Sequence, residues 1–259
     1  MLDHQPAVPG TTIFRLDVNP RILVLDFSSL REQGLMLNRI AAFVEKAGMP
    51  RDRIMSDAEL AAAIRGTGES PDTFYYGHDY GAASLASFFS LADRDEIRLT
   101  PQEEWLRRLM RREGWSAPDQ QGGLLSIPQA GSSKNIDKAA REVILRHELS
   151  HGEYFTNPDY AAFTHSFWTQ VLTHQERERI RAHLRSLGYD SNVEEIMENE
   201  TQAYLIFTDS PEFFTPAMIG MTKARLATLR AGFRRGMPQG WLRDGLERRS
   251  GDQKAAPRR

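Results

Sequence analysis

Two histidines and a glutamate stand in the pattern His147-Glu148-Leu149-Ser150-His151, within a segment from about residue 136 to 154 that has helical apolar spacing. Positions four apart in an α-helix lie on the same face, one turn above the other. His147 and His151 can therefore each give one ring nitrogen to the same Zn²⁺ ion at about 2.0–2.1 Å. Glu148 lies about 100° further round the helix, where it can act as a general base but is too offset to be a natural ligand.

The residues around this pattern favour a shared metal over two ordinary histidines. On a helical wheel the two histidines extend an apolar face that spans about 60° on either side of His147. Two adjacent buried histidines need polar partners, because an unpaired buried polar group is costly. One metal ion would provide a partner for both. The other members of this face are Ile136, Ala140, Val143, Ile144 and Tyr154.

A catalytic zinc site needs a third protein ligand, and the predicted helix over residues 193–207 offers four glutamates. Only Glu200 lies in the middle of the apolar face of that helix, because Glu194, Glu195 and Glu198 lie about 120–160° away on the solvated side. A buried carboxylate needs a metal or a partner of opposite charge. Glu200 is therefore the candidate third ligand, and a buried salt bridge to an arginine is the alternative.

With these residues the chain resembles the zincin metallopeptidases of gluzincin type, although no subfamily is identified. In that family an H-E-x-x-H helix is completed by a glutamate on a second helix, often written N-E-x-x-A, which here is Asn199-Glu200-Thr201-Gln202-Ala203. The resemblance covers about residues 120–208. It implies a zincin-like core with one Zn²⁺ ion per chain, with His147, His151 and Glu200 as ligands and Glu148 as the general base.

The chain departs from related patterns at defined places. The metzincin continuation is excluded, because Tyr154 and Asn157 stand where that class has a glycine and a histidine. The stretch from His151 to Glu200 is much longer than in thermolysin-like enzymes and leaves room for inserted helices. Tyr204 replaces the acidic residue that those enzymes carry four places after the ligand glutamate, which leaves the partner of the zinc histidines unassigned.

Other residues could take part in catalysis. Tyr154 and Tyr204 lie on the same faces as the predicted ligands, so either could donate to the oxyanion of the transition state or could be an aromatic packed beside the site. The polar cluster His78-Asp79-Tyr80 also has two interpretations. A histidine held by a carboxylate could be an electrostatic catalyst, but a structural turn is the preferred interpretation.

Composition excludes several classes of protein. The chain of 259 residues has no cysteine, so disulfides and thiolate metal sites are impossible. Its formal net charge of −2 argues against a dedicated nucleic-acid binder. No apolar run approaches the ~20 residues of a membrane span, and no signal peptide is visible at the start. The lack of cysteine suits an exported or periplasmic protein without requiring one, and the oligomeric state is left open.

The pattern of elements predicts an α+β fold that is mostly helical, with a small sheet in the N-terminal half. Strands are expected at residues 21–27, 74–76 and 124–127. The expected division is an N-terminal α/β part over residues 1–120 and an H-E-x-x-H and C-terminal helical part over 121–242, packed together. Residues 243–259, which carry arginines, a lysine and glycines with little to bury, are expected to be a disordered tail.

Zincins as a family lay an extended substrate along an edge strand beside the metal helix. By that resemblance we expect Leu124–Ile127 to be an edge strand lining the metal cleft. The predicted function is zinc-dependent hydrolysis of peptide bonds in a peptide or protein substrate, by a zinc-activated water with Glu148 as the base. The alternatives are a non-catalytic, metal-stabilised helical binding module and a zinc amidase that acts on a non-protein amide.

Overall fold

Within residues 10–117 and 119–246, which the computed structural model describes, one four-stranded sheet forms in the order β1-β2-β4-β3. β1 (Thr11–Arg15) is antiparallel to β2 (Ile22–Phe27), and β2 is parallel to β4 (Gly123–Pro128). β3 (His78–Gly81) is antiparallel to β4 and forms one edge of the sheet. β2 and β4 are buried along their whole length, which explains their almost wholly apolar sequences.

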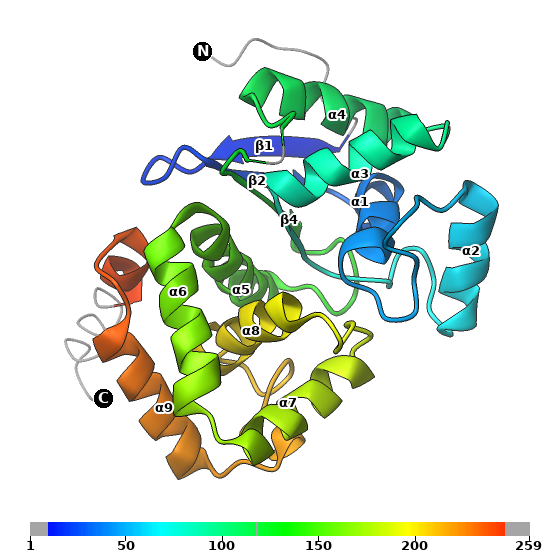
Figure 1. Cartoon of the computed structure of the whole chain (residues 1–259). Coiled ribbons are helices and arrows are strands. Elements are labelled where there is room, and N and C mark those ends of the chain that lie inside the picture. Colours follow the sequence, from blue (N-terminus) through cyan, green and yellow to red (C-terminus); the bar gives the residue numbers. More distant parts are fainter. Residues whose placement is uncertain (1–9, 118, 247–259) are drawn as a thin grey trace.

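Helices of the N-terminal part cover one face of this sheet (Figure 1). Leu23 and Leu25 of β2 point to this side and belong to the largest apolar cluster, to which the helices also contribute. Capping boxes begin two of these helices, at Ser56 and Thr100. The helices of this part are α1 (Leu30–Val44), α2 (Asp57–Gly66), α3 (Ala82–Arg94) and α4 (Pro101–Glu113).

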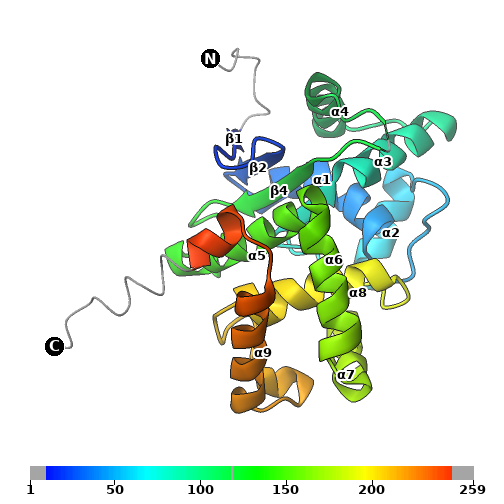
Figure 2. The ribbon, with the colours of Figure 1, turned by 60° about the vertical axis from the view of Figure 1, so that its left-hand side comes forward.

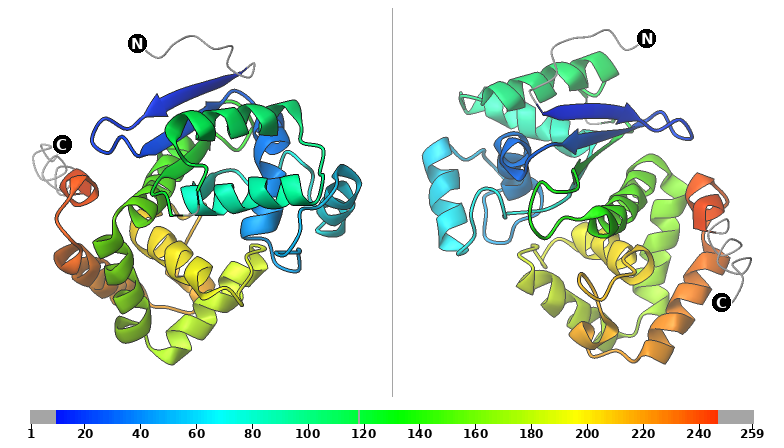
Figure 3. Two further views of the ribbon diagram at one scale, coloured as in Figure 1. Left: turned by 45° about the horizontal axis from the view of Figure 1, so that its top comes forward. Right: turned by 180° about the vertical axis from the view of Figure 1, so that it is seen from behind.

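The C-terminal part is helical and lies on the other side of the sheet, as Figures 2 and 3 show. Its first helix, α5, packs directly against β4. α6, α8 and η2 contact α5, whereas α7 packs against α8 and α9 packs against η2. Two π-helical turns and one 3₁₀ turn interrupt the α-helices. The elements are α5 (Lys138–Thr156), α6 (Pro158–Ser166), η1 (Phe167–Val171), α7 (His174–Ser186), α8 (Glu194–Gln202), η2 (Ala203–Phe207), η3 (Pro216–Ile219) and α9 (Lys223–Gly236).

α5 approaches the sheet most closely where two glycines meet. A Cβ atom built on Gly123 of β4 would lie 3.4 Å from the Cα atom of Gly152 on α5. A Cβ atom on Gly152 would in turn lie 3.0 Å from Ile22 and 3.2 Å from Leu125. The absence of side chains at these two positions allows the helix to lie directly on the strand.

The predicted fold class is confirmed: the chain is α+β and mostly helical, with a small sheet. The strands predicted at residues 21–27 and 124–127 are β2 and β4. No helix of the described chain is long and apolar enough to cross a membrane. Residues 241–246 are helical, so the predicted tail begins with an ordered turn, and residues 247–259 lie outside the described residues.

Two strand predictions were wrong. Leu124–Ile127 is not an edge strand, because β4 lies between β2 and β3. Residues 74–76 form no strand, and the strand instead begins at His78, where a turn was expected. Strand order depends on pairing between distant segments, which local periodicity does not report. Because β4 follows the expected boundary at residue 120, the two predicted parts share one sheet.

Candidate metal centre

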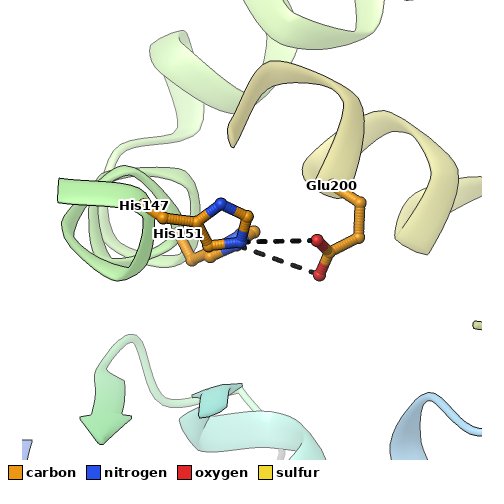
Figure 4. Close-up of side chains that lie close together, drawn as sticks. All are labelled: His147, His151 and Glu200. Atoms are coloured by element: carbon orange, nitrogen blue, oxygen red, sulfur yellow. Dashed lines mark ion pairs between the residues drawn. The ribbon is translucent and has the colours of Figure 1, made fainter. Parts of the chain in front are cut away.

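α5 and α8 bring the three predicted metal ligands together. The rings of His147 and His151 meet edge to face, with their centroids 4.8 Å apart. Nε2 of His147 lies 3.6 Å from Oε2 of Glu200, and Nε2 of His151 lies 3.8 Å from Oε1. Figure 4 shows the two histidines of one helix facing the glutamate of the other. The helical spacing thus selected, among the four glutamates of its segment, the one that faces both histidines.

These separations suit ligands of one ion better than hydrogen-bonded partners. Hydrogen bonds span about 2.7–3.2 Å, whereas ligand atoms about 2.0–2.1 Å from a tetrahedral ion are roughly 3.3–3.4 Å apart. Nε2 of His151 and Oε2 of Glu200 are buried and have no hydrogen-bond partner among the described residues. Two imidazoles and one carboxylate are a donor set that Zn²⁺ binds in hydrolytic sites. The residues present therefore fit a zinc ion.

A hydrogen bond between the second ring nitrogen of His147 and Thr208 determines the tautomer of the imidazole. Nδ1 lies 2.9 Å from Oγ1 of Thr208, and this hydroxyl donates its only proton to the carbonyl oxygen of Ala203 at 3.0 Å. The hydroxyl must then accept a hydrogen bond from Nδ1–H, which leaves the lone pair on Nε2 facing Glu200. Burial lowers the pKa of His147 to about 3, so the ring is neutral near pH 7 and able to bind a metal.

Asp79 on β3 faces the second histidine. Its Oδ1 lies 3.5 Å from Nδ1 of the fully buried His151. Asp79 pairs in register with Leu125, whose side chain packs on the α5 side of the sheet, whereas Tyr80 belongs to the cluster on the opposite side. The alternation of side chains along a strand therefore brings Asp79 to the metal helix.

Both interpretations of the His78-Asp79-Tyr80 cluster were wrong. The three residues are in a strand, and His78 is not held by its neighbouring carboxylate. Nδ1 of His78 instead lies 2.9 Å from the hydroxyl of Tyr80, on the face away from α5. Burial lowers the pKa of His78 to about 3, which leaves it neutral near pH 7. Of the three residues, Asp79 is the one that faces His151, and no local pattern could indicate so distant a partner.

Glu148 is buried beside the metal centre, with 4% of its surface exposed. Its Oε2 has no hydrogen-bond partner in the described part of the chain. Its Oε1 lies against the backbone of Gly77, where a Cβ atom would be only 2.0 Å away. Burial raises the pKa of Glu148, and the negative charges of Asp79 and Glu200 raise it further. A carboxylate with a raised pKa is suited to accept a proton and return it.

Sequence reasoning missed another buried carboxylate, that of Glu45, which follows the last residue of α1. Burial raises the pKa of Glu45, and the negative charges of Asp79 and Glu200 raise it further. Burial likewise raises the pKa of Asp79 to about 7 and raises the pKa of Glu200. The only local signal for Glu45 is an acid that directly follows the apolar end of a predicted helix. This local signal does not distinguish a buried glutamate from one that is exposed to solvent at the end of a helix.

A pocket of about 210 Å³ opens beside His147 and Glu148. Its walls are mostly aromatic and aliphatic, and Thr208 and Glu69 contribute polar atoms. A group bound in this pocket would therefore meet a mostly apolar surface. The apolar lining consists of Phe74, Tyr75, Tyr76, Val143, Ile144, Leu187, Tyr189, Tyr204 and Phe213.

The two tyrosines predicted as oxyanion donors lie in different surroundings. Tyr204 lines the pocket, and its ring meets that of His147 edge to face at a centroid distance of 4.7 Å. Tyr154 does not line this pocket. Burial raises the pKa of Tyr154, and the negative charges of Glu195 and Glu198 raise it further. The structure thus places Tyr204 beside the metal centre and brings Tyr154 close to two acids of α8 instead.

No family model, no curated protein and no solved structure matches this chain. A fold alone does not determine an activity, so the function has to be argued from the site itself. The features of the site that bear on function are the donor set, the tautomer of His147, the unpaired carboxylate of Glu148 and the adjoining pocket.

Proposed function

We propose that the protein is a zinc-dependent metallopeptidase of gluzincin type, which hydrolyses peptide bonds. The observation that carries this proposal is the convergence of two imidazole nitrogens, from His147 and His151, on the two oxygens of Glu200. Structural zinc sites have four protein ligands, whereas catalytic sites have three and an open position. The buried, unpaired carboxylate of Glu148 beside three such ligands supports a catalytic site over a structural one.

Each residue then has a defined part in the reaction. A bound Zn²⁺ ion supplies Lewis acidity, which lowers the pKa of water and stabilises an oxyanion. Glu148 takes a proton from the attacking water on a carboxylate oxygen and returns it to the leaving nitrogen. Thr208 and Asp79 orient the imidazoles of the two ligands. The pocket that Tyr204 lines binds the substrate side chain and excludes water. The phenol of Tyr204 is the candidate donor to the oxyanion.

A second candidate is a zinc amidase that acts on a small non-protein amide. Two observations favour this candidate. The backbone at Gly77 lies against the carboxylate of Glu148, and the adjoining pocket has a volume of only about 210 Å³. Such a site accommodates a short substrate more easily than a folded protein. Parallel assays with casein, with a library of short peptides and with N-acylated amino acids distinguish the two candidates.

The test of the proposed function combines metal analysis with three variants. The wild-type protein should hold about one Zn²⁺ ion per chain and hydrolyse amide substrates. Glu148→Gln should retain zinc and lose nearly all hydrolysis, because only the proton transfer is removed. His147→Ala and Glu200→Ala should lose both. Equal loss of zinc in Glu148→Gln and His147→Ala would show that Glu148 is a ligand or a fold element rather than the base.

A further inference from the structure

Glu200 belongs to two groups of potential metal donors. One contains His147 and His151, and the other contains Glu45 and Asp79, with the donor atoms of each group within 4.8 Å of one another. The second group faces a separate pocket of about 120 Å³, whose lining includes Glu45, Asp79 and Glu200 but neither histidine. The carboxylate of Glu200 is thus available to both.

Asp79 indicates a ligand in this second pocket independently of the number of acids around it. Its side chain is nine-tenths buried, yet none of the hydrogen bonds in the described chain ends on its carboxylate. The 3.5 Å contact with Nδ1 of His151 is long for a hydrogen bond, and Nδ1 itself has no other partner. A buried carboxylate without donors is unfavourable, and a cation in the pocket would provide the missing partner.

Charge balance points the same way. A single Zn²⁺ ion would offset two of the four negative charges that the buried carboxylates carry when all are ionised. Lys46 follows Glu45 in sequence, but its ammonium lies 4.1 and 4.0 Å from the ring centres of Phe74 and Tyr75, and 3.6 Å from the carboxylate of Glu69. Two negative charges are therefore left without an adjacent full counter-charge, which is costly at low dielectric constant. The four buried carboxylates are those of Glu45, Asp79, Glu148 and Glu200.

We propose that Glu45, Asp79 and Glu200 bind a second divalent cation, which shares the carboxylate of Glu200 with the zinc site. Its all-oxygen donor set selects a hard cation such as Mg²⁺, Mn²⁺ or Ca²⁺, whereas the two imidazoles select Zn²⁺. The pocket has room for water ligands, because one water takes about 30 Å³. The proposal rests on the proposed function only through the ligand role of Glu200.

The second cation would hold Asp79 and Glu200 in their charged forms. A charged Asp79, 3.5 Å from Nδ1 of His151, favours a proton on that nitrogen, and a charged Glu200 keeps both oxygens available as ligand atoms. Here the two donor sets differ in chemistry, so each ion can be titrated separately.

The experiment loads the full-length chain with one equivalent of Zn²⁺, removes unbound zinc and titrates Mn²⁺. The electron paramagnetic resonance signal of free Mn²⁺ reports binding without reference to activity. One Mn²⁺ ion per chain is expected. Glu45→Gln should weaken Mn²⁺ binding at least about tenfold while zinc content and circular dichroism stay as in the wild type. Glu195→Gln is the matched control, because Glu195 lines the same pocket but is exposed.

Two results would overturn the second site. One is a wild-type protein that binds no Mn²⁺ at millimolar concentration, which would mean that the carboxylates share protons instead. The other is equal Mn²⁺ affinity in Glu45→Gln and the wild type. Neither result affects the peptidase proposal, which fails separately if the zinc-loaded protein hydrolyses no amide. His147→Ala separates the sites further, since it should lose zinc and still bind Mn²⁺.

Discussion

Oδ1 of Asp79 lies 3.5 Å from Nδ1 of His151, and this contact joins β3, an edge strand of the sheet, to α5, the helix that carries two of the candidate metal ligands. The other candidate ligand histidine, His147, is oriented by Thr208, which follows η2 in the C-terminal part. The two imidazoles are thus held by partners from the two parts of the fold. The geometry of the centre therefore depends on how α5 lies between them.

Thr208→Val should lower the affinity for zinc by about 10–100-fold, because the valine cannot accept the Nδ1–H of His147 and the ring loses its fixed tautomer. Thr208→Ser keeps the hydroxyl and should bind zinc nearly as well as the wild type. Competition with a chromophoric chelator measures both affinities. Equal affinities in the wild type and the valine variant would show that the hydroxyl does not orient His147.

Gly77→Ala should retain zinc but lose hydrolysis by about two orders of magnitude. The new Cβ atom would lie 2.0 Å from Oε1 of Glu148, so the base or the covering segment has to move, and a displacement of about 1 Å costs on the order of a hundredfold in rate. Gly66→Ala is the control, because nothing lies within 4 Å of a Cβ atom there. Steady-state kinetics on the same substrate compare the three proteins, and normal activity in Gly77→Ala would contradict the close approach.

Removal of zinc by a chelator should destabilise the protein, because the carboxylates around Glu200 then face one another without a cation. A ligand at a hundred times its dissociation constant stabilises the folded state by about 2.7 kcal/mol. A fall of several degrees in the melting temperature is therefore expected, and added zinc should reverse it. In Glu200→Gln the melting temperature should respond much less to chelator or to zinc. A chelator-insensitive wild type would argue against a bound metal.

Glu176 at the start of α7 should give a pH-dependent contribution to stability. The Arg225 guanidinium and the Thr173 cap hold the pKa of Glu176 at about 2, below its ordinary value of 4.5. A lowered folded-state pKa means that this stabilisation is present above pH 4.5 and is lost as the pH falls towards 2. Glu176→Gln should therefore cost about 0.5–1 kcal/mol at pH 6 and progressively less at lower pH. Urea unfolding of both proteins between pH 6 and 3 measures the difference, and a constant difference would contradict it.

The sequence predicted best those helices and strands whose formation depends on residues close together in the chain. Helical periodicity located α5 and α8 and selected Glu200 among neighbouring acids. The Ser/Thr-x-x-Glu patterns at Ser56, Thr100 and Thr173 coincide with the capping boxes that begin α2, α4 and α7. Apolar runs located β2 and β4. These features are decided within a few residues, so the local sequence carries the information.

Features that depend on distant pairing were missed. β3 reads His-Asp-Tyr-Gly, with no apolar alternation, because its residues have different partners: Tyr80 packs in the core, and Asp79 faces His151. β1 was not predicted either, since its burial alternates only weakly along five residues. Thr208 and Glu45 are ordinary residues in their local segments. Their proximity to the centre follows from how α1, η2 and α5 pack, which no local pattern contains.

The close contact between Gly152 and the sheet fixes the position of α5, and with it the position of His151 in the candidate metal centre. Gly152 directly follows His151, and its neighbours on the sheet would lie only 3.0–3.3 Å from an added methyl group. A side chain there would act as a wedge that lifts α5 away from β4. This displacement of α5 would increase the distance between His151 and Asp79 and change the distance between His151 and Glu200 on α8. None of these three residues would itself have been substituted. A single methyl group buried under the helix would thus change the distances between the candidate metal ligands, although it does not itself contact them.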